Sequence, residues 1–347
     1  MMLLLVLACG AGPDACDGAA DCSAGPADGT DGTTTTDGTD GSDATDGADG
    51  TDSADGTDGT GGTDGTEPTP TSSGCGLAPR DSAGGVQITL ELGAEAGGSR
   101  GYWLSLPRDY DPSRAYGLVL GFPGTNWVGR QIQPYLSLEN EAGAGDFIFA
   151  YPDPLWRDFP VWGTYGGWTL GPHAYPADGN EDLVFTEAVL DDIEASYCID
   201  TSAIFATGHS WGGDMAQVVG CFLGDRIDAT VPVAANRPYW FETGGGWTSC
   251  TGDAAAWTFF GQADSHFTMQ SYPGEYGDEC RDFWVDTRGC DDADPFALAW
   301  GADGECVAYA GCSSDVRYCL YEASAAHGAP SYYSAAAMDW FVERAGR

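Results

Sequence analysis

Continuous apolar runs of four or five residues limit what this chain can fold into more than any other feature. The runs at 118–122, 147–151 and 203–206 contain no polar residue that would mark a solvent-facing side. We therefore predict that they are strands of a parallel sheet covered on both faces. The segment 182–197 has its apolar residues at helical spacing instead. Further strands are predicted at 86–92, 102–106, 229–233, 257–260 and 316–321, and a last helix at 334–345. This alternation predicts an α/β fold, with a mostly parallel central sheet and helices on both faces.

Every Trp, Tyr and Phe lies within residues 75–347. Residues 10–74 are almost entirely Asp, Gly, Thr, Ala and Ser, with Asp-Gly-Thr units repeated between 28 and 66. Such a segment has too little apolar surface to offset the entropy lost on ordering, so we expect a disordered acidic linker. A calcium-binding repeat is the alternative, but the Asp spacing is irregular and the closing Glu of a calcium loop is absent. Residues 75–347 are then left as one folded domain.

The charge of the chain excludes several classes of partner. It has 53 acidic and 13 basic side chains, which give a formal net charge of −40 at pH 7. Nucleic acids and anionic membranes would be repelled by such a surface, so we expect neither as an electrostatic partner. We expect a monomer.

The first nine residues predict export. They are apolar and end in Val6-Leu7-Ala8-Cys9, which resembles the lipobox of bacterial lipoproteins, although a basic segment before the apolar run is missing. We therefore expect residues 1–9 to be a lipoprotein-like signal and the protein to be secreted or held at the outer cell surface. Contact with a membrane would come only through a lipid on Cys9.

The cysteines also indicate an oxidising compartment. There are 12 cysteines without a Cys-x-x-Cys pair and only four histidines, so disulfides are favoured over a metal site, and we expect no metal. The predicted pairs are Cys16 with Cys22, Cys198 with Cys221, and Cys75 with Cys250. The sequence does not pair Cys280, Cys290, Cys306, Cys312 and Cys319. Their odd number implies a free thiol or a pairing across these groups.

The motif at 208–213, Gly-His-Ser-Trp-Gly-Gly, is the strongest sign of chemistry. A Gly-x-Ser-x-Gly match alone is weak in so glycine-rich a chain. Here, however, the motif follows the apolar strand 203–206 and runs into a predicted helix at 214–219. This strand, sharp turn and helix is the context of a nucleophile elbow, which would expose the Ser210 hydroxyl. The backbone N–H of Trp211 would then be one oxyanion donor.

A serine nucleophile needs a base and an acid, which follow it along the chain in this arrangement. Asp264 comes directly after the strand 257–260, and His327 follows the next strand. We therefore predict that Ser210, Asp264 and His327 form the catalytic triad. Asp291 and Asp292 are the fallback acids.

The other histidines and an aromatic-rich segment are candidates for substrate contacts. His173 precedes the nucleophile, which is the wrong order for the base, and His209 is too close to it in the chain. His266, two residues beyond the acid, is expected to line the cleft. Aromatic residues between 156 and 175 are either a packed loop or a platform for an aromatic or sugar ring. We therefore predict substrate contacts for His209, His266 and Trp168.

A second oxyanion donor is expected in the loop after an earlier strand. Residues 122–127 read Phe-Pro-Gly-Thr-Asn-Trp and follow a predicted central strand. Our choice is the backbone N–H of Thr125.

Taken together, these motifs resemble the polyhydroxybutyrate depolymerase and feruloyl esterase family of secreted α/β-hydrolases. The similar segments are 74–76, 100–107, 121–126, 197–200, 206–213, 280–284 with 289–290, and Cys306, Cys312 and Cys319 before His327. The resemblance implies the α/β-hydrolase fold and a catalytic role for Ser210, Asp264 and His327. The sequence departs from the family's pattern at two places. Pro123 stands where a His usually begins the oxyanion loop, and 328–330 lacks the Trp-Pro type sequence that usually follows the catalytic His.

The function expected from these features is hydrolysis of a carboxylic ester through an acyl-enzyme, without a cofactor. The first choice of substrate is a feruloyl or acetyl ester on plant polysaccharide, and the second is a polyhydroxyalkanoate polyester. The alternatives from other classes are a non-catalytic surface binding protein on a hydrolase scaffold and a serine peptidase of the same fold.

Overall fold

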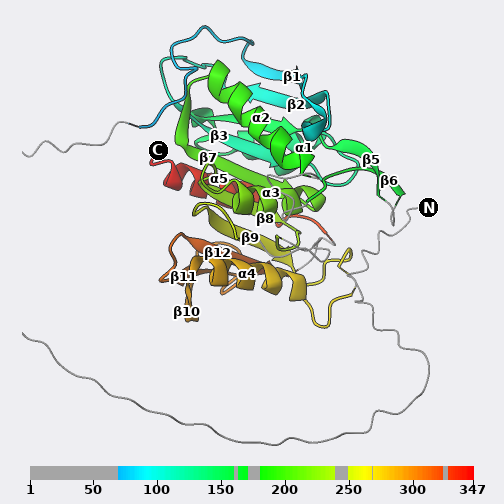
Figure 1. Cartoon of the computed structure of the whole chain (residues 1–347). Helices are drawn as coiled ribbons and strands as arrows, with labels where there is room; N and C mark the ends of the chain where they lie inside the picture. Colours follow the sequence, from blue (N-terminus) through cyan, green and yellow to red (C-terminus); the bar gives the residue numbers. More distant parts are fainter. Residues whose placement is uncertain (1–68, 160–162, 171–179, 239–248, 268, 323–326) are drawn as a thin grey trace, which may run out of the picture. The chain divides into compact units, whose positions relative to one another are not determined.

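A ten-stranded sheet organises the residues described by the computed structural model, namely 69–159, 163–170, 180–238, 249–267, 269–322 and 327–347 (Figure 1). The strand order is β1-β2-β4-β3-β7-β8-β9-β12-β11-β10. The strands are β1 (Gly84–Leu90), β2 (Arg100–Leu106), β3 (Tyr116–Phe122), β4 (Phe147–Pro152), β7 (Ile199–His209), β8 (Ala229–Val233), β9 (Ala255–Gly261), β10 (Asp291–Ala297), β11 (Cys306–Ala310) and β12 (Val316–Tyr321). The strands from β4 to β12 in this order pair in parallel, and those at the two edges pair antiparallel. The predicted mostly parallel sheet is confirmed.

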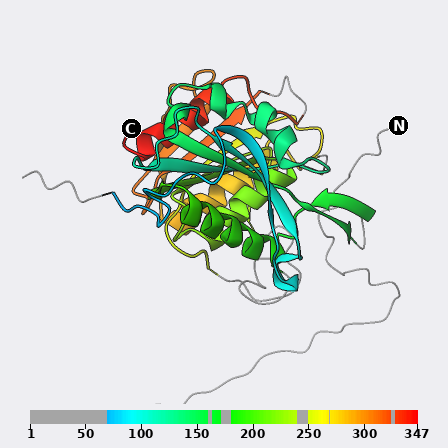
Figure 2. The same cartoon turned by 90° about the horizontal axis from the view of Figure 1, so that it is seen from above.

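Helices cover both faces of the sheet, as predicted (Figure 2). Leu118 and Leu120 of β3 pack in one buried cluster with residues of α2, α3 and α4, whereas Val119 packs in a second cluster with residues of α1 and α5. The helices are α1 (Gly129–Leu136), α2 (Glu181–Ser196), α3 (Trp211–Phe222), α4 (Glu275–Arg288) and α5 (Tyr333–Arg344), with short 3-10 helices at Ala94–Ala96, Leu138–Asn140 and Ala144–Asp146. Within the described ranges, none of these helices combines the length and the apolar character needed to cross a bilayer.

The burial of the strands explains why most of them could be predicted. Every residue of β3, β4, β8 and β9 is buried, which fits their apolar runs. In β1, by contrast, half-buried and exposed residues alternate, as the period-two pattern predicted. The helices α1 and α4 and the strands β10 and β11 were not predicted.

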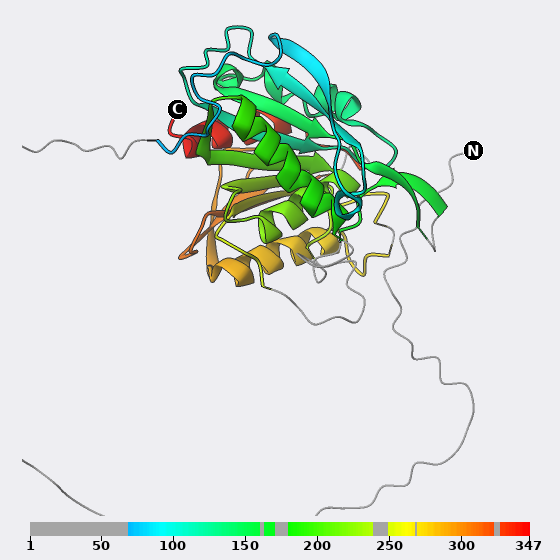
Figure 3. The same ribbon diagram turned by 45° about the horizontal axis from the view of Figure 1, so that its top comes forward.

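A two-stranded hairpin, β5 (Leu155–Phe159) with β6 (Gly163–Gly167), was also not predicted. It extends away from the ten-stranded sheet (Figures 1 and 3). Its base is tied to α2 by a buried carboxylate, since Asp182 accepts hydrogen bonds from the backbone N and the hydroxyl of Thr169 at 2.6 and 2.8 Å. Asp182 also pairs with the buried Arg100 at 2.6 Å and with Arg157 of β5 at 3.1 Å.

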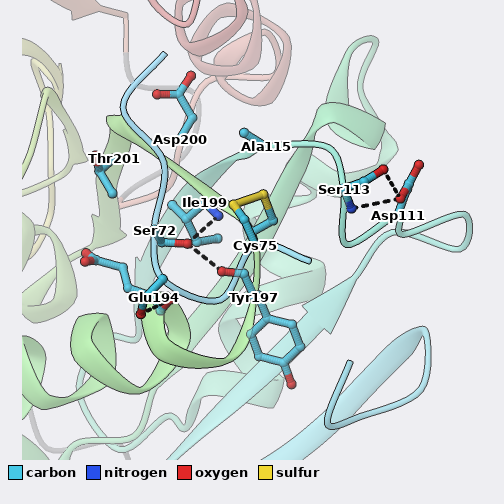
Figure 4. The surroundings of a disulfide bond; sticks show 12 residues. Ser72, Cys75, Asp111, Ser113, Ala115, Glu194, Tyr197, Ile199, Asp200 and Thr201 are labelled. Atoms are coloured by element: carbon cyan, nitrogen blue, oxygen red, sulfur yellow. Dashed lines mark hydrogen bonds between the residues drawn. A yellow bond between two sulfur atoms is a disulfide. The ribbon is translucent and has the colours of Figure 1, made fainter. Parts of the chain in front are cut away.

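The predicted pairing of four cysteines is wrong, although all four form disulfides. The bonds join Cys75 to Cys198 and Cys221 to Cys250, not Cys198 to Cys221 and Cys75 to Cys250. Hydrogen bonds hold the neighbouring segments together beside each pair. The segment before Cys75 runs along the start of β7, where the Ser72 hydroxyl donates to the Tyr197 carbonyl at 2.6 Å (Figure 4). Near the other bond, the Thr251 backbone N–H donates to the Cys221 carbonyl at 2.7 Å.

The remaining cysteines of the folded region form two further bonds and leave one free thiol. Cys290 pairs with Cys312, and Cys306 pairs with Cys319. Cys280 on α4 is free and buried, which accounts for the odd number of cysteines. Cys9, Cys16 and Cys22 lie outside the described residues.

Both ends of the described fold meet at Asp200, next to the first residue of β7. Thr71 forms an isolated antiparallel bridge with Asp200, and the Thr201 backbone N–H donates to Pro70 at 2.9 Å. From the other end, the Arg347 guanidinium pairs with the Asp200 carboxylate at 3.2 Å. Ser210 follows the other end of the same strand. Residues 70–71 and Arg347 therefore lie at the end of β7 opposite the elbow.

Candidate active site

Ser210 occupies a strained turn between β7 and α3. Its backbone has φ 57° and ψ −129°, a combination that non-glycine residues rarely adopt. The turn needs glycines around it, because a Cβ on Gly208 would lie 2.2 Å from the Gly212 carbonyl oxygen, and one on Gly212 would lie 2.0 Å from that of Phe122. The predicted strand, turn and helix of a nucleophile elbow are therefore present.

The structure brings the three predicted triad residues together. The Nε2 atom of His327 lies 2.7 Å from Ser210 Oγ, and its Nδ1 atom lies 2.8 Å from Asp264 Oδ2. Asp264 is 4% exposed, while Ser210 and His327 are only partly buried. Such a chain of hydrogen bonds lets the imidazole accept the hydroxyl proton while the carboxylate orients the ring. The fallback acids, Asp291 and Asp292, lie instead on the exposed edge strand β10.

The loop after β3 reaches the nucleophile. A Cβ on Gly124 would lie 3.3 Å from that of Ser210, so the backbone before Thr125 passes against the elbow. Asn126 has a backbone φ of 63° and forms two hydrogen bonds with the backbone of Gly166 in β6. Its N–H donates to the Gly166 carbonyl at 2.8 Å, and its side-chain oxygen accepts from the Gly166 N–H at 3.0 Å. The hairpin β5–β6 therefore holds the predicted oxyanion loop.

Trp168 supports this loop from the interior, so its predicted contact with substrate is wrong. The indole is completely buried and packs edge-on against Phe122, with ring centroids 5.4 Å apart. Its Nε1–H donates to the Pro123 carbonyl at 2.9 Å. Pro123 stands where the family that this chain resembles usually has a His. The hydrogen bond from the Trp168 indole is one of the contacts that hold the loop.

The two other predicted substrate contacts differ in position. The side chain of His209 is 9% exposed, and its Nε2 lies 2.7 Å from the His327 carbonyl oxygen, so we do not propose it as a substrate contact. His266 is accessible, with 41% of its side chain exposed, and its ring stacks on that of His327 at 3.8 Å. Burial and the nearby His327 lower the pKa of His266, which favours its neutral form. A substrate contact for His266 remains a prediction.

Tyr135 is a site residue that the sequence analysis missed. Its hydroxyl accepts a hydrogen bond from the Ala329 backbone N–H at 3.1 Å, and its ring lies 4.7 Å from that of His209. It belongs to α1, a short helix with a proline inside, which the apolar pattern did not reveal. No motif marked this tyrosine.

Asp264, His266 and His327 are also the one group among the described residues whose ligand atoms lie close enough together to bind a metal ion, within 4.8 Å of one another. Two of the three are the predicted acid and base, and the Asp264 oxygens are engaged by the His327 Nδ1–H and the His266 backbone N–H. The donor set is thus already used in a hydrogen-bonded triad.

The fold and this site define a class: the chain is a carboxylic ester hydrolase of the α/β-hydrolase fold. Its curated relatives are feruloyl esterases, which confirms the resemblance found in the motifs. It is 29% identical over 257 residues to a probable feruloyl esterase C of Aspergillus clavatus, which covers 72% of this chain and 81% of the relative. It is 28% identical to the feruloyl esterase C of Emericella nidulans, over 69% of this chain and 80% of that protein.

Solved structures show the same fold. An acetyl xylan esterase from Aspergillus awamori superposes with a TM-score of 0.51 at 16% identity, and the match covers 74% of this chain and 98% of that one. At this identity the likeness establishes the fold alone. No protein-family model matches the chain.

Proposed function

We propose that this protein is a serine esterase that releases feruloyl groups from plant polysaccharide through an acyl-enzyme. The observation that carries the proposal is the unbroken hydrogen-bond chain from Ser210 through His327 to Asp264, at 2.7 and 2.8 Å. The substrate class is supported by the feruloyl esterases that the chain resembles over about 70% of its length.

The geometry suits the first half of an acyl transfer. His327 Nε2 takes the proton from the Ser210 hydroxyl as the oxygen attacks the ester carbonyl. Asp264 keeps the Nδ1 proton of His327 directed away from the serine and stabilises the imidazolium. The backbone N–H groups of Trp211 and Thr125 are the proposed oxyanion donors. The bond from the acyl carbon to the sugar oxygen then breaks as His327 protonates that oxygen, so the sugar leaves as an alcohol and the acyl group stays on Ser210.

The second half repeats the same proton transfers with water. His327 removes a proton from a water molecule that attacks the acyl carbonyl, and it returns this proton to the Ser210 oxygen as the carboxylic acid leaves. Bond making and proton transfer thus balance without a cofactor. Because His266 is exposed and its ring stacks on that of His327, it is the proposed substrate contact among the described residues.

The test is hydrolysis of three esters by the full chain: methyl ferulate, acetylated xylan and a 3-hydroxybutyrate oligomer. We expect methyl ferulate to be turned over fastest, and Ser210→Ala to lower kcat by a factor on the order of 10³ or more. The matched control is Ser202→Ala, a change at the exposed far end of the same strand. A preference for the oligomer would move the substrate class to polyesters. Turnover of no ester would favour a binding protein.

Export agrees with the four disulfides among the described residues, because such bonds are typical of proteins from oxidising compartments. We further propose a lipid anchor at Cys9. If so, Cys9→Ser should shift the esterase from the detergent phase to the aqueous phase when the expressing cells are extracted. An unchanged distribution would leave export without an anchor.

A further inference from the structure

The buried imidazole of His209 has no role in the acyl-transfer steps. It is 9% exposed, and its ring lies between those of Tyr135, at 4.7 Å, and His327, at 4.9 Å. Burial, with a smaller effect from His327, lowers the pKa of His209 to about 4. The ring is therefore neutral at the pH where a serine esterase works. A neutral imidazole has one N–H to donate, and its placement has to be explained.

The hydrogen bond of His209 settles which nitrogen carries this proton. Nε2 lies 2.7 Å from the backbone carbonyl oxygen of His327, and a carbonyl oxygen can only accept. Nε2–H is thus the donor. The residue next to the nucleophile in the sequence is in this way bonded to the backbone of the residue that supplies the base.

The backbone of His327 is in a conformation that needs such support. Its φ is 101°, in the region that favours glycine, and a strained residue persists only where its surroundings fix it. Two further contacts hold the residues just after it. The Tyr321 hydroxyl donates to the Gly328 carbonyl at 2.6 Å, and the Ala329 N–H donates to Tyr135. His209 contacts the carbonyl of His327 itself.

From these contacts we propose that His209 is a positioning residue of the esterase, which fixes the backbone of His327 so that its ring meets both Ser210 and Asp264. The inference rests on the proposed function, because it acts through the proposed base. The bond directly joins the residue beside Ser210 to the residue carrying the base, so displacement of one is transmitted to the other. Holding the base in this way matters because a shift of about 1 Å in a catalytic group can cost on the order of 10²-fold in rate.

Three variants of the full chain separate the hydrogen bond from the bulk of the ring. His209→Gln places an amide N–H close to where Nε2 lies, whereas His209→Asn is one methylene too short to reach the His327 carbonyl. His209→Phe keeps the ring contacts and removes the donor. We expect His209→Asn and His209→Phe to lower kcat for methyl ferulate at least tenfold, with KM within about twofold of the original. His209→Gln should retain most of the original kcat.

Two readouts distinguish positioning from general stability. The rate of Ser210 labelling by a fluorophosphonate should fall in parallel with kcat in the Asn and Phe variants, since it needs the activated serine but no bound polysaccharide. The NMR signal of the proton between His327 Nδ1 and Asp264 should weaken or shift in these two variants and return in Gln. This signal needs no turnover, so it tests the inference even if the proposed substrate is wrong.

The outcomes are distinct. Wild-type kcat, labelling rate and NMR signal in the Asn and Phe variants would overturn the inference and leave the proposed esterase intact. So would a Gln variant that loses as much as Asn, because the donor would then not be what matters. If the His209→Phe variant fails to fold, the comparison of His209→Gln with His209→Asn tests the inference alone.

Discussion

Replacing His209 should make the protein less sensitive to mild acid. The side chain is buried with its pKa lowered to about 4, against 6.5 for a free histidine. The unfolded chain therefore binds a proton at this site between pH 6.5 and pH 4 that the folded chain does not bind. Stability contributed by the neutral ring is present above pH 6.5 and is lost as the pH falls toward 4.

The size of this effect follows from the pKa shift. One pKa unit corresponds to about 1.4 kcal/mol, so the complete shift is worth about 3 kcal/mol in the free energy of unfolding. Between pH 7 and pH 5, about 2 kcal/mol of it should be lost. A His209→Gln variant cannot bind this proton and should lack that part of the pH dependence.

The assay is urea unfolding of both proteins at pH 7, 6 and 5 with the disulfides intact. Other titrating groups contribute to both curves, so the informative quantity is the difference between the two proteins at each pH. We expect this difference to change by about 2 kcal/mol in favour of the variant on going from pH 7 to pH 5. Parallel curves would show that His209 is protonated in the folded protein, contrary to the burial argument.

Three further substitutions test the surroundings of the site. Trp168→Phe leaves the buried Pro123 carbonyl without its donor and should cost about 1–3 kcal/mol of unfolding free energy, together with a lower kcat, measured by urea unfolding and ester assay. Asp182→Ala leaves Arg100 buried without its 2.6 Å carboxylate partner and should cost about 3–5 kcal/mol, so an unchanged thermal midpoint would contradict the assigned ion pair. Asp264→Asn should lower kcat by a factor on the order of 10⁴ without a comparable change in KM, because the amide favours the wrong tautomer of the base; steady-state kinetics across pH measure this.

The sequence could predict elements whose apolar residues follow a clear pattern, whether a continuous run, a period of two or a helical spacing. The strand β8 (Ala229–Val233) and the strand β12 (Val316–Tyr321) match their predicted bounds, and the helix predicted at 334–345 is shifted by one residue. The hairpin β5–β6 was missed because β6 has three glycines in five residues, so it has few side chains from which a pattern could be read. Similarly, β10 is exposed throughout and carries no burial pattern at all.

The triad residues could be identified for a related reason. A nucleophile elbow and two loops at the carboxyl ends of strands bring distant residues to one edge of a parallel sheet. The order of these segments along the chain therefore nearly determines which residues become the nucleophile, the acid and the base. The contacts of His209 and Trp168 could not be found this way. Both side chains point inward and bond to backbone carbonyls, and backbone partners leave no mark in the sequence. The disulfide pairing failed similarly, because Cys198 and Cys221 are close in the chain but lie against different neighbouring segments.

The meeting of both ends of the described fold at Asp200 has a practical consequence. Any segment attached before Thr71 or after Arg347 leaves the fold from the same spot, at the start of β7. Ser210 lies ten residues beyond Asp200 along this strand, which corresponds to about 33 Å. A resin attached at this spot would lie at the end of β7 opposite Ser210. A short peptide joining the two ends should also be tolerated, so that new ends could be opened in an exposed loop.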